Sequence, residues 1–266
     1  MALPESLIEE DVARRIGELQ RVIEAQQQRA HQHLQLAAKV HGSLLPSPVR
    51  TDRLDVDVRR YLPVEGVGGD YCQIRFPSED VCYITVWDVT GHGIGAALLA
   101  TRVSSEVRHG VLSELLDGLN RFVCDHFADA GLFLTFVAVR IDLARRELTW
   151  SGAGHPSPIL LSPDGATAAL ASQNLMIRVQ PECLATEPEH RRRLDPGNRV
   201  LIYTDGVTEV FDSTGSELGE RGLAAIAVSA RSGDVFSTTD RILERISAFQ
   251  AGPAADDRTL ILLAVQ

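Results

Sequence analysis

Four aspartates in the sequence stand beside a glycine or another acid, where apolar segments begin or end. They are Asp70 in Val-Gly-Gly-Asp, Asp88 in Trp-Asp-Val-Thr-Gly, Asp205 in Tyr-Thr-Asp-Gly and Asp256 in Asp-Asp-Arg-Thr. A strand fixes a carboxylate at its end, and the adjoining loop leaves one side open to a ligand. Glycine lets the backbone turn tightly and allows a hydrated ion to come close. The pattern therefore predicts carboxylates held at the edge of a sheet.

Two chemistries fit these acids. Asp before Gly is a common turn pair, and two aspartates at the start of a strand can simply be solvated. Carboxylates that converge on one place, however, repel each other unless cations neutralise them, and oxygen-only ligands favour Mg²⁺ or Mn²⁺ over zinc or copper. Each aspartate alone is compatible with a turn, whereas the four together favour a divalent-cation site.

Two histidines lie in glycine-containing turns. His92 belongs to 91–99, a turn that opens into a predicted helix, and the free N–H groups of that helix would face an anion. His92 is compatible with a turn residue and, equally, with a proton carrier or phosphate contact. For His155, in Ala-Gly-His-Pro, loop ordering is favoured over a role in the site.

The first part of the chain predicts one long helix from Ile8 to Leu45, without proline. Two rows of residues spaced by seven run along it: Ile16, Ile23, Ala30, Ala37 and Leu44, and Val12, Leu19, Gln26, His33 and Val40. The two rows favour a dimeric coiled coil, although polar and small residues weaken the middle of the seam. The alternative, a single helix packed on its own domain, stays open. Pro46 and Pro48 end the helix. The predicted domains are a helical linker, 1–48, and a globular domain, 49–266.

The remainder of the chain alternates short apolar runs with longer helical windows. Predicted strands are Leu54–Val58, Val81–Val86, Leu132–Ile141, Leu148–Ser151, Arg199–Thr204 and Thr259–Val265. Predicted helices are Gly95–Arg108, Ser113–Ala128, Glu220–Ala230 and Val235–Phe249. Because hairpin-length loops join consecutive strands, we expect an α+β fold with mostly antiparallel sheets packed together and helices on their outer faces.

Composition narrows the class of protein. The 44% hydrophobic and 23% charged residues describe a globular chain, and no run approaches the roughly 20 apolar residues of a membrane span. A net charge of −10 argues against a nucleic-acid partner, and the cluster Arg191–Arg193 is predicted to be a solvated loop. The cysteines lack zinc-type spacing and are predicted to be reduced thiols; they are Cys72, Cys82, Cys124 and Cys183. An acidic N-terminus without signal-peptide order predicts a cytoplasmic location.

Taken in order, the motifs resemble the bacterial branch of the PPM-type (protein phosphatase 2C-like) serine/threonine phosphatases, the SpoIIE-like and RsbU-like regulators of sigma factors. The resemblance covers about 37–266 and is specific as an ordered set. It rests on Leu44–Pro46, Gly68–Asp70, Asp88–Gly93, Ala96–Leu98, Ala153–Pro156, Pro196–Gly197, Leu201–Gly206, Glu209 and Asp256–Thr259. It implies an α-β-β-α sandwich with a two-metal site at one edge of the sheets.

The resemblance also implies the site. Its metal ligands are Asp70, Asp88, the Val89 carbonyl, Asp205, Asp256 and Asp257, and its catalytic residues are Asp70, Asp88 and His92. Asp88 would bridge two Mn²⁺ or Mg²⁺ ions, and Asp70 would bind one of them. Cations roughly 3.5–4 Å apart lower the pKa of a bridging water, which attacks phosphorus in line. Trp87, where the family more often has a small residue, and the segment Ala171–Gln180 depart from the family pattern and concern the shape of the substrate groove.

The implied partner is a regulatory protein that carries phosphoserine or phosphothreonine, namely a STAS-type anti-sigma-factor antagonist. The chain is expected to form a homodimer through its leading helix, with a signal that arrives through that helix or from a separate sensor protein. One alternative is a catalytically silent phosphoprotein-binding module of the same fold, which the presence of all four aspartates disfavours. Another is a two-metal hydrolase of small phosphoesters or nucleotides, and no P-loop or dinucleotide-binding signature supports it.

Overall fold

The computed structural model describes residues 5–61, 67–91, 93–107, 110–127, 131–172, 174–179, 189–253 and 256–266. The helices are α1 (Glu5–Ser43), α2 (Ile94–Ser104), α3 (Leu112–His126), α4 (Gly219–Ala230), α5 (Val235–Phe249) and the 3₁₀ turn η2 (Asp205–Val207). The strands are β1 (Val49–Arg50), β2 (Leu54–Tyr61), β3 (Tyr71–Ser78), β4 (Val81–Val89), β5 (Leu134–Asp142), β6 (Glu147–Ala153), β7 (Ile159–Leu161), β8 (Thr167–Ala169), β9 (His190–Arg193), β10 (Arg199–Tyr203) and β11 (Arg258–Val265).

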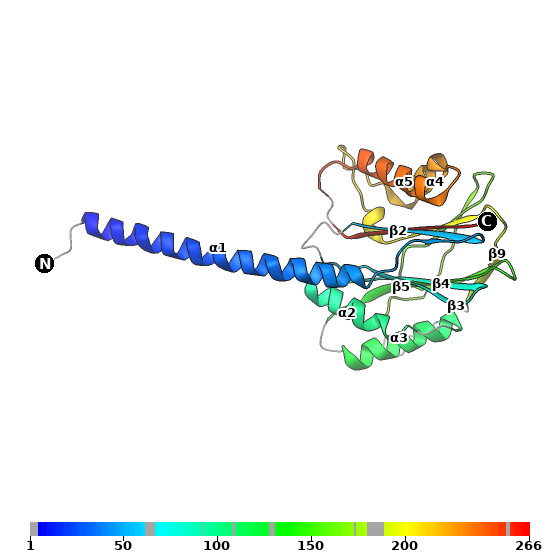
Figure 1. Ribbon diagram of the computed structural model, residues 1–266, viewed down its shortest axis with the longest axis horizontal. Helices are drawn as coiled ribbons and strands as arrows, with labels where there is room; N and C mark the ends of the chain where they lie inside the picture. Colours follow the sequence, from blue (N-terminus) through cyan, green and yellow to red (C-terminus); the bar gives the residue numbers. More distant parts are fainter. Residues whose placement is uncertain are drawn as a thin grey trace.

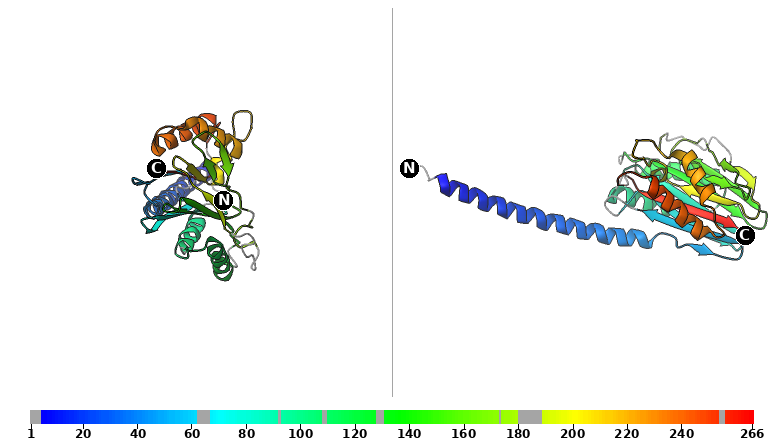
Figure 2. Two further views of the ribbon diagram at one scale, coloured as in Figure 1. Left: turned by 90° about the vertical axis from the view of Figure 1, so that its right-hand side faces the viewer. Right: turned by 90° about the horizontal axis from the view of Figure 1, so that it is seen from above.

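The strands form two sheets that lie face to face between two pairs of helices (Figures 1 and 2). Sheet A has the strand order β1-β2-β11-β10-β7-β8 and carries α4 and α5 on its outer face. Sheet B has the order β3-β4-β5-β6-β9 and carries α2 and α3. Neighbouring strands in both sheets are antiparallel. This arrangement confirms the predicted α+β fold with an α-β-β-α sandwich.

Sheet A is buried on both of its faces, and β11 shows how its sequence achieves this. Ile261 and Leu263 pack into the core between the sheets, whereas Leu260 and Leu262 pack against the helices on the outer face. Successive side chains of a strand point to opposite faces, so a strand covered on both sides reads as a continuous apolar run. Full burial of each large apolar side chain contributes about 1.5–3 kcal/mol. The layered core therefore holds the strand ends, and the acids beside them, in fixed positions.

Helix α1 extends away from the sandwich as a long projecting rod (Figure 1). Its apolar side chains are open to solvent, with Leu19 exposed by 62% and Ile23 by 51%. The helix contacts the domain near its C-terminal end, where the buried His41 ring lies 5.6 Å from the Tyr71 ring. The Tyr71 hydroxyl also donates to the Leu44 carbonyl at 3.2 Å. The alternative in which this helix packs along its own domain is therefore wrong for residues 14–33, while half-buried residues such as Leu34 and Ala37 lie closer to the domain.

Five described strands were absent from the sequence-based expectation, namely β1, β3, β7, β8 and β9. Strand β3 was not predicted, because exposed residues break its apolar pattern after Ile74. The cluster Arg191–Arg193, predicted to be a loop, is the edge strand β9 and pairs with β6. Its arginines are exposed as expected, and Glu189 and Asp195 form ion pairs with them. Charged side chains are tolerated on an edge strand, where they discourage pairing with another chain.

The remaining global predictions concern thiols and membranes. Cys72 and Cys82 are free and buried, and Cys124 is half-buried with its thiol 4.0 Å from Asn120 Oδ1. Cys183 lies outside the described residues. Within the ranges that the structure describes, no helix combines the length and the apolar character needed to cross a membrane.

Candidate metal centre

The predicted aspartates lie at one end of the sandwich and come from both sheets. Asp70 directly precedes β3, and Asp88 is the penultimate residue of β4, both in sheet B. Asp205 begins η2 just beyond β10, and Asp256 lies just ahead of β11, both in sheet A. The two sheets therefore present their carboxylates toward a common edge, as the strand-end positions in the sequence indicate.

Asp70 is the most deeply buried of these acids. Its carboxylate oxygen Oδ2 accepts hydrogen bonds from the hydroxyls of Thr204 and Thr259, each at 2.8 Å. Burial raises the pKa of Asp70 to about 7, against the lowering effect of these two hydrogen bonds and of Arg60. The guanidinium of Arg60 also donates to the Asp70 carbonyl. Asp70 is thus held by both strands of sheet A that end at the site.

Asp88 carries the strongest electrostatic perturbation in the cluster. Burial raises its pKa to about 9, and repulsion from the other acids adds to the effect. The repelling groups are Asp70, Asp205, Asp256 and Asp257. No described residue donates a hydrogen bond to this carboxylate. Repulsion within the acidic cluster therefore acts on Asp88 from four neighbouring acids at once.

Close packing of backbone around two glycines links the sheets at this point. A Cβ atom on Gly68 would overlap the Asp257 carboxylate, so this position requires glycine. A Cβ atom on Gly69 would lie 2.5 Å from the Val89 carbonyl oxygen and 2.9 Å from Asp88 Oδ1. The Gly-Gly pair therefore allows acids of both sheets, together with the Val89 carbonyl, to approach one place.

Backbone amides orient the acids of sheet A. The Gly206 N–H donates to Asp205 Oδ1 at 2.8 Å, and the Asp257 N–H donates to Asp256 Oδ1 at 2.8 Å. Asp257 is buried, and its Oδ2 accepts a hydrogen bond from the Gly69 N–H at 3.1 Å. Burial and then repulsion from Asp256 raise the pKa of Asp205. These bonds fix the carboxylates that close the cluster from the second sheet.

The donor set fits hard divalent cations by type and charge, since it consists of carboxylates and one backbone carbonyl. In the part of the chain that is described, no three His, Cys, Asp or Glu side chains converge closely enough to hold a metal ion. The acids are nevertheless near enough for four of them to raise the pKa of Asp88. That repulsion opposes convergence, and a divalent cation would offset it. The assignment of individual ligands stays a prediction.

Trp87, the departure from the family pattern next to Asp88, has a structural role. Its buried ring stacks on Tyr71 with a centroid distance of 4.9 Å and on Phe136 with one of 5.6 Å. Its indole N–H donates to the Ala100 carbonyl of α2 at 3.2 Å. The large residue therefore fixes the end of β4 against the helix layer.

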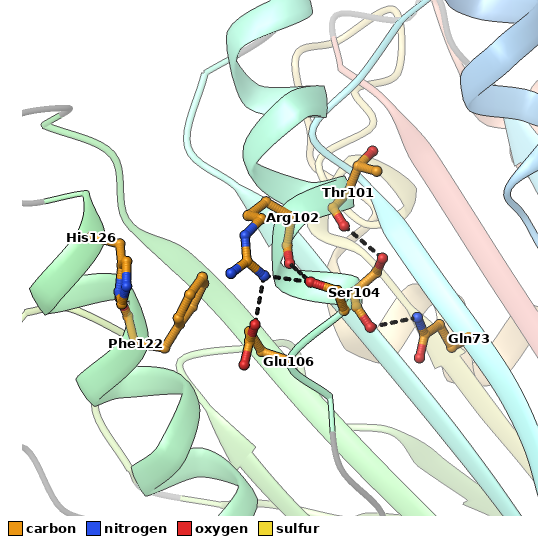
Figure 3. Close-up of polar contacts among 8 residues, drawn as sticks. Gln73, Thr101, Arg102, Ser104, Glu106, Phe122 and His126 are labelled. Atoms are coloured by element: carbon orange, nitrogen blue, oxygen red, sulfur yellow. Dashed lines mark hydrogen bonds and ion pairs between the residues drawn. The ribbon is translucent and has the colours of Figure 1, made fainter.

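Helix α2, which follows the turn beyond β4, is tied to β3 and α3 (Figure 3). The Gln73 side chain donates to the Ser104 carbonyl at 3.0 Å. Arg102 Nη1 pairs with Glu106 Oε1 at 2.6 Å, and its guanidinium carbon lies 4.5 Å from the Phe122 ring centroid. These contacts hold the C-terminal end of α2 against β3 and α3.

The two histidines have different outcomes. His92 lies outside the described residues, so its role stays a prediction. His155 Nδ1 lies 2.8 Å from the Thr135 hydroxyl, and Thr135 is paired with Asp88 across β4 and β5. Burial lowers the pKa of His155 to about 3, so its ring is neutral at neutral pH. This environment favours the structural interpretation of His155.

Sequence reasoning missed the residues that support Asp70. Thr204 and Thr259 lie within the motifs Leu201–Gly206 and Asp256–Thr259 but were given no role. The signal available was that a threonine hydroxyl buried at a strand end needs a hydrogen-bond partner. Arg60 was not singled out. Two of its nitrogens, Nε and Nη1, are buried without a hydrogen-bond partner among the described residues. Arg60 lies just beyond the predicted strand Leu54–Val58, and this position is only a weak signal in the sequence.

Comparisons with known proteins agree with this picture. The family model described as Stage II sporulation protein E (SpoIIE) matches residues 78–266. Phosphoserine phosphatase RsbU of Bacillus subtilis (strain 168) is 25% identical over 244 residues, which cover 89% of this chain and 71% of RsbU. The matched family region contains Asp88, Asp205, Asp256 and Asp257.

Solved structures show the same fold. The SiaA-PP2C domain of Pseudomonas aeruginosa is similar with a TM-score of 0.74 and 19% identity, over 90% of this chain and 98% of that domain. RsbX in complex with magnesium is similar with a TM-score of 0.62 and 16% identity, over 83% of this chain and 99% of RsbX. Since the family model covers well over half of the sequence, the chain belongs to the SpoIIE family of PP2C-like phosphatases, in the branch that includes RsbU.

Proposed function

We propose that this protein is a metal-dependent serine/threonine protein phosphatase that hydrolyses phosphoserine or phosphothreonine on a regulatory protein. The observation that carries the proposal is the cluster of coupled carboxylates around Asp88 at the shared edge of the two sheets. Membership in a phosphatase family supports the reaction. The magnesium complex of the similar RsbX structure supports a divalent cation, Mn²⁺ or Mg²⁺.

In this proposal the protein supplies the cage and its orientation. The oxygens that would hold two cations are those of Asp70, Asp88, Val89, Asp205, Asp256 and Asp257. Bound divalent cations supply Lewis acidity, which lowers the pKa of a water and neutralises phosphoryl charge. Thr204 and Thr259 keep the Asp70 carboxylate in place through their 2.8 Å hydrogen bonds. Arg60 adds positive charge at the end of the sandwich to which a phosphoryl group would come.

The proposed substrate is a phosphorylated STAS-type anti-sigma-factor antagonist. RsbU, the relative with 25% identity, is a phosphoserine phosphatase, which supports a phosphoprotein rather than a nucleotide. The test is phosphate release, in Mn²⁺, from a panel of phosphorylated antagonists and from nucleotides. We expect release from at least one phosphoprotein and its loss in EDTA. Release at full rate in EDTA would contradict metal dependence, and release from nucleotides alone would contradict the substrate class.

A homodimer through α1 is the second part of the proposal. The helix projects from the domain, and the predicted seam residues Ile23 and Leu19 are exposed. Association would remove these apolar side chains from water, with about 25 cal/mol per Å² of apolar area buried. Because α1 meets the domain at Tyr71, next to Asp70, a change in helix packing would reach the site through β3. The input to that helix would come from a separate sensor protein.

The dimer is tested on the full chain with a matched pair of substitutions. Ile23→Glu places a charge in the predicted seam and should give a monomer by multi-angle light scattering. Leu36→Glu changes an exposed apolar residue of the same helix that lies outside both seven-residue rows, with 63% of its side chain exposed, and should remain dimeric. A monomeric wild type, or a dimeric Ile23→Glu variant, would overturn this part of the proposal.

A further inference from the structure

A cavity of about 470 Å³ lies beneath α5 on the outer face of sheet A. Leu260 lines it and belongs to the apolar layer between sheet A and the helices above. Thr259, the residue before Leu260 in β11, points to the opposite face of the sheet, and its hydroxyl donates a hydrogen bond to the Asp70 carboxylate. The sheet lies between the cavity and the Asp70 carboxylate, and Arg60 is shared by both, since it lines the cavity and donates to the Asp70 carbonyl. Its volume lies in the range of about 300–1,000 Å³ that small-molecule sites occupy.

The lining divides into an apolar part and a polar part. Val207, Ile246 and Leu260 supply apolar surface. Arg59, Arg258 and Gln250 supply hydrogen-bond donors. No acidic residue of the described chain lines this cavity, although the protein carries a net charge of −10. The surface thus matches a molecule with one acidic group and an apolar body.

Arg59 is oriented by two carboxylates, which also offset its charge, so Arg258 is the other cation on which an anion would depend. Its Nε lies 3.0 Å from Asp57 Oδ2, and its Nη2 lies 3.0 Å from Asp240 Oδ1. Asp57 is buried and Asp240 is exposed, so the guanidinium is fixed between the sheet and α5. Among the described residues, Nη1 of Arg59 has no partner. A guanidinium that is already fixed loses little conformational entropy when it binds an acceptor.

We propose that this cavity binds a small amphipathic anion, with a single carboxylate or phosphate group on a compact apolar body. The acidic group lies against Arg59 and Arg258, and the apolar body covers Ile246 and Leu260. A charge-assisted hydrogen bond to guanidinium is about twice as strong as a neutral one. Each CH₂ group that enters the apolar part tightens binding about fourfold.

The cavity wall is continuous with both loops that carry predicted metal ligands of sheet A. Val207 ends the 3₁₀ turn that Asp205 begins, and Arg258 directly follows Asp257. A bound ligand therefore restrains both loops, and by thermodynamic reciprocity it changes the affinity for Mn²⁺. This coupling, unlike the cavity itself, rests on the proposed function.

The binding test uses the full chain in metal-free buffer, with octanoate and octyl phosphate as probes in isothermal titration calorimetry. Acetate supplies the acidic group without the body, and 1-octanol supplies the body without the charge. We expect octanoate or octyl phosphate to bind at least tenfold more tightly than either control, and the tighter of the two identifies the acidic group. Octanol binding as tightly as both anions, or no binding by either anion at millimolar concentration, would overturn the proposal.

Two neighbouring substitutions locate the site. Ser247 lines the cavity mouth and Ala248 does not, and both are exposed positions of α5. Ser247→Phe should weaken binding of the anion at least tenfold by filling the cavity, whereas Ala248→Phe should bind as wild type. Equal binding by the two variants would overturn the location. Should Ser247→Phe fail to fold in a thermal melt, Arg258→Gln decides, with a tenfold loss expected and unchanged affinity contradicting the site.

The coupling is measured by Mn²⁺ titration with and without saturating octanoate. A change of threefold or more in the Mn²⁺ dissociation constant supports the coupling. An unchanged constant overturns the coupling and leaves the cavity site intact. Absence of any Mn²⁺ binding would contradict the coupling and the proposed function together, while the octanoate result would still stand.

Discussion

The acids that the two sheets bring to the centre differ in how strongly they act on one another. In sheet B, burial raises the pKa of Asp70 to about 7 and that of Asp88 to about 9. In sheet A, burial and then repulsion from Asp256 raise the pKa of Asp205, and Asp256 itself is exposed. Sheet B therefore supplies the acids whose ionisation is most strongly opposed by their surroundings. Within sheet A, solvent reaches Asp256 most easily, whereas Asp205 is half-buried and Asp257 is buried.

The difference has a source in the fold. β4 lies inside sheet B, where Trp87 points toward the layer of α2 and α3 and the next residue, Asp88, points toward the space between the two sheets, close to Gly69. The acids of sheet A stand on a 3₁₀ turn and on the short segment before β11, and backbone amides orient them. Enclosure makes a carboxylate costly to ionise, and it also makes a cation beside it more strongly bound. The comparison predicts unequal effects of substitution.

The largest effect is expected at Asp88. Asp88→Asn removes a carboxylate that all the other acids face, so we expect phosphate release in Mn²⁺ to fall about a thousandfold, as when the main electrostatic group of a site is lost. Asp195→Asn is the control, because Asp195 is exposed in the turn before β10, at the opposite end of that strand from Asp205. Steady-state rates on a phosphoprotein measure the effect. A variant with more than a tenth of the wild-type rate would contradict the central place of Asp88.

The same substitution has an opposite effect on stability without metal. The folded-state pKa of Asp88 is raised to about 9, so its ionised form opposes folding increasingly as pH rises from about 4 toward 9. In EDTA at pH 8, Asp88→Asn should therefore be more stable than wild type by roughly 1–3 kcal/mol, after allowance for solvent screening. At pH 4 the difference should be small. Urea unfolding at both pH values provides the measurement, and a less stable variant at pH 8 would be the contrary result.

Smaller effects are expected from the acids of sheet A. Asp205→Ala and Asp256→Ala should each weaken Mn²⁺ binding about tenfold or more. Removal of one member of a repelling cluster should leave the unfolding free energy in EDTA within about 1 kcal/mol of wild type. Calorimetric titration with Mn²⁺ and urea unfolding measure the two quantities. Unfolding of either variant in metal-free buffer, under conditions where wild type stays folded, would show that these acids are structural.

The comparison also shows what the sequence could and could not predict. Asp88 and Asp205 were found because apolar runs lead into them and glycines follow, which is a local pattern. The layers were predictable because alternating apolar residues and hairpin-length connections are local too. The unequal burial of the acids was not predictable, because it depends on which sheet each strand joins. That choice is fixed by long-range pairings such as Asp88 opposite Thr135.

Three failures have a similar cause. Strand β3 has exposed residues in its second half, so its sequence lacks the alternation that reveals other strands. The partnership of Asp70 with Thr259 joins residues 189 positions apart, and no spacing rule links them. The cluster Arg191–Arg193 forms a strand because it pairs with the edge of β6, although its run of charged residues favours a loop. In each case tertiary context outweighs local preference.

A further prediction separates the hydrogen bonds of Asp70 from ordinary ones. Thr259→Val removes a bond to a buried acid, and at pH 8, where Asp70 is ionised, this should cost about 1.5–3 kcal/mol. Thr239→Val removes a buried bond to the Val235 carbonyl and should cost about 0.5–1.5 kcal/mol. At pH 5, below the pKa of about 7, the Thr259→Val loss should shrink toward that of the control. Equal losses at both pH values would indicate that Asp70 is not ionised when it accepts this bond.

The smallest effect is expected at His41, where α1 meets the sheet B side of the site. Burial, together with the charge of Arg60, lowers the pKa of His41 to about 4. The unfolded chain takes up a proton at this ring near pH 6.5, and the folded protein does not until about pH 4, so acidification through this window favours unfolding. The raised pKa values of Asp70 and Asp88 act in the opposite direction, because their protonation favours the folded state.

The two contributions are separated by comparing variants rather than pH values alone. Between pH 7 and pH 5, His41→Phe should remove a loss on the order of 1–2 kcal/mol, since one pKa unit corresponds to about 1.4 kcal/mol and the ring of the unfolded chain gains its proton within this window. His31→Phe, at an exposed position of the same helix, should leave the pH dependence of wild type unchanged. Urea unfolding of the three proteins in metal-free buffer gives the comparison. Identical pH dependence in wild type and His41→Phe would mean that the junction of α1 with β3 opens enough to hydrate the ring. The helix would then lack the firm contact with Tyr71 through which a signal could reach Asp70.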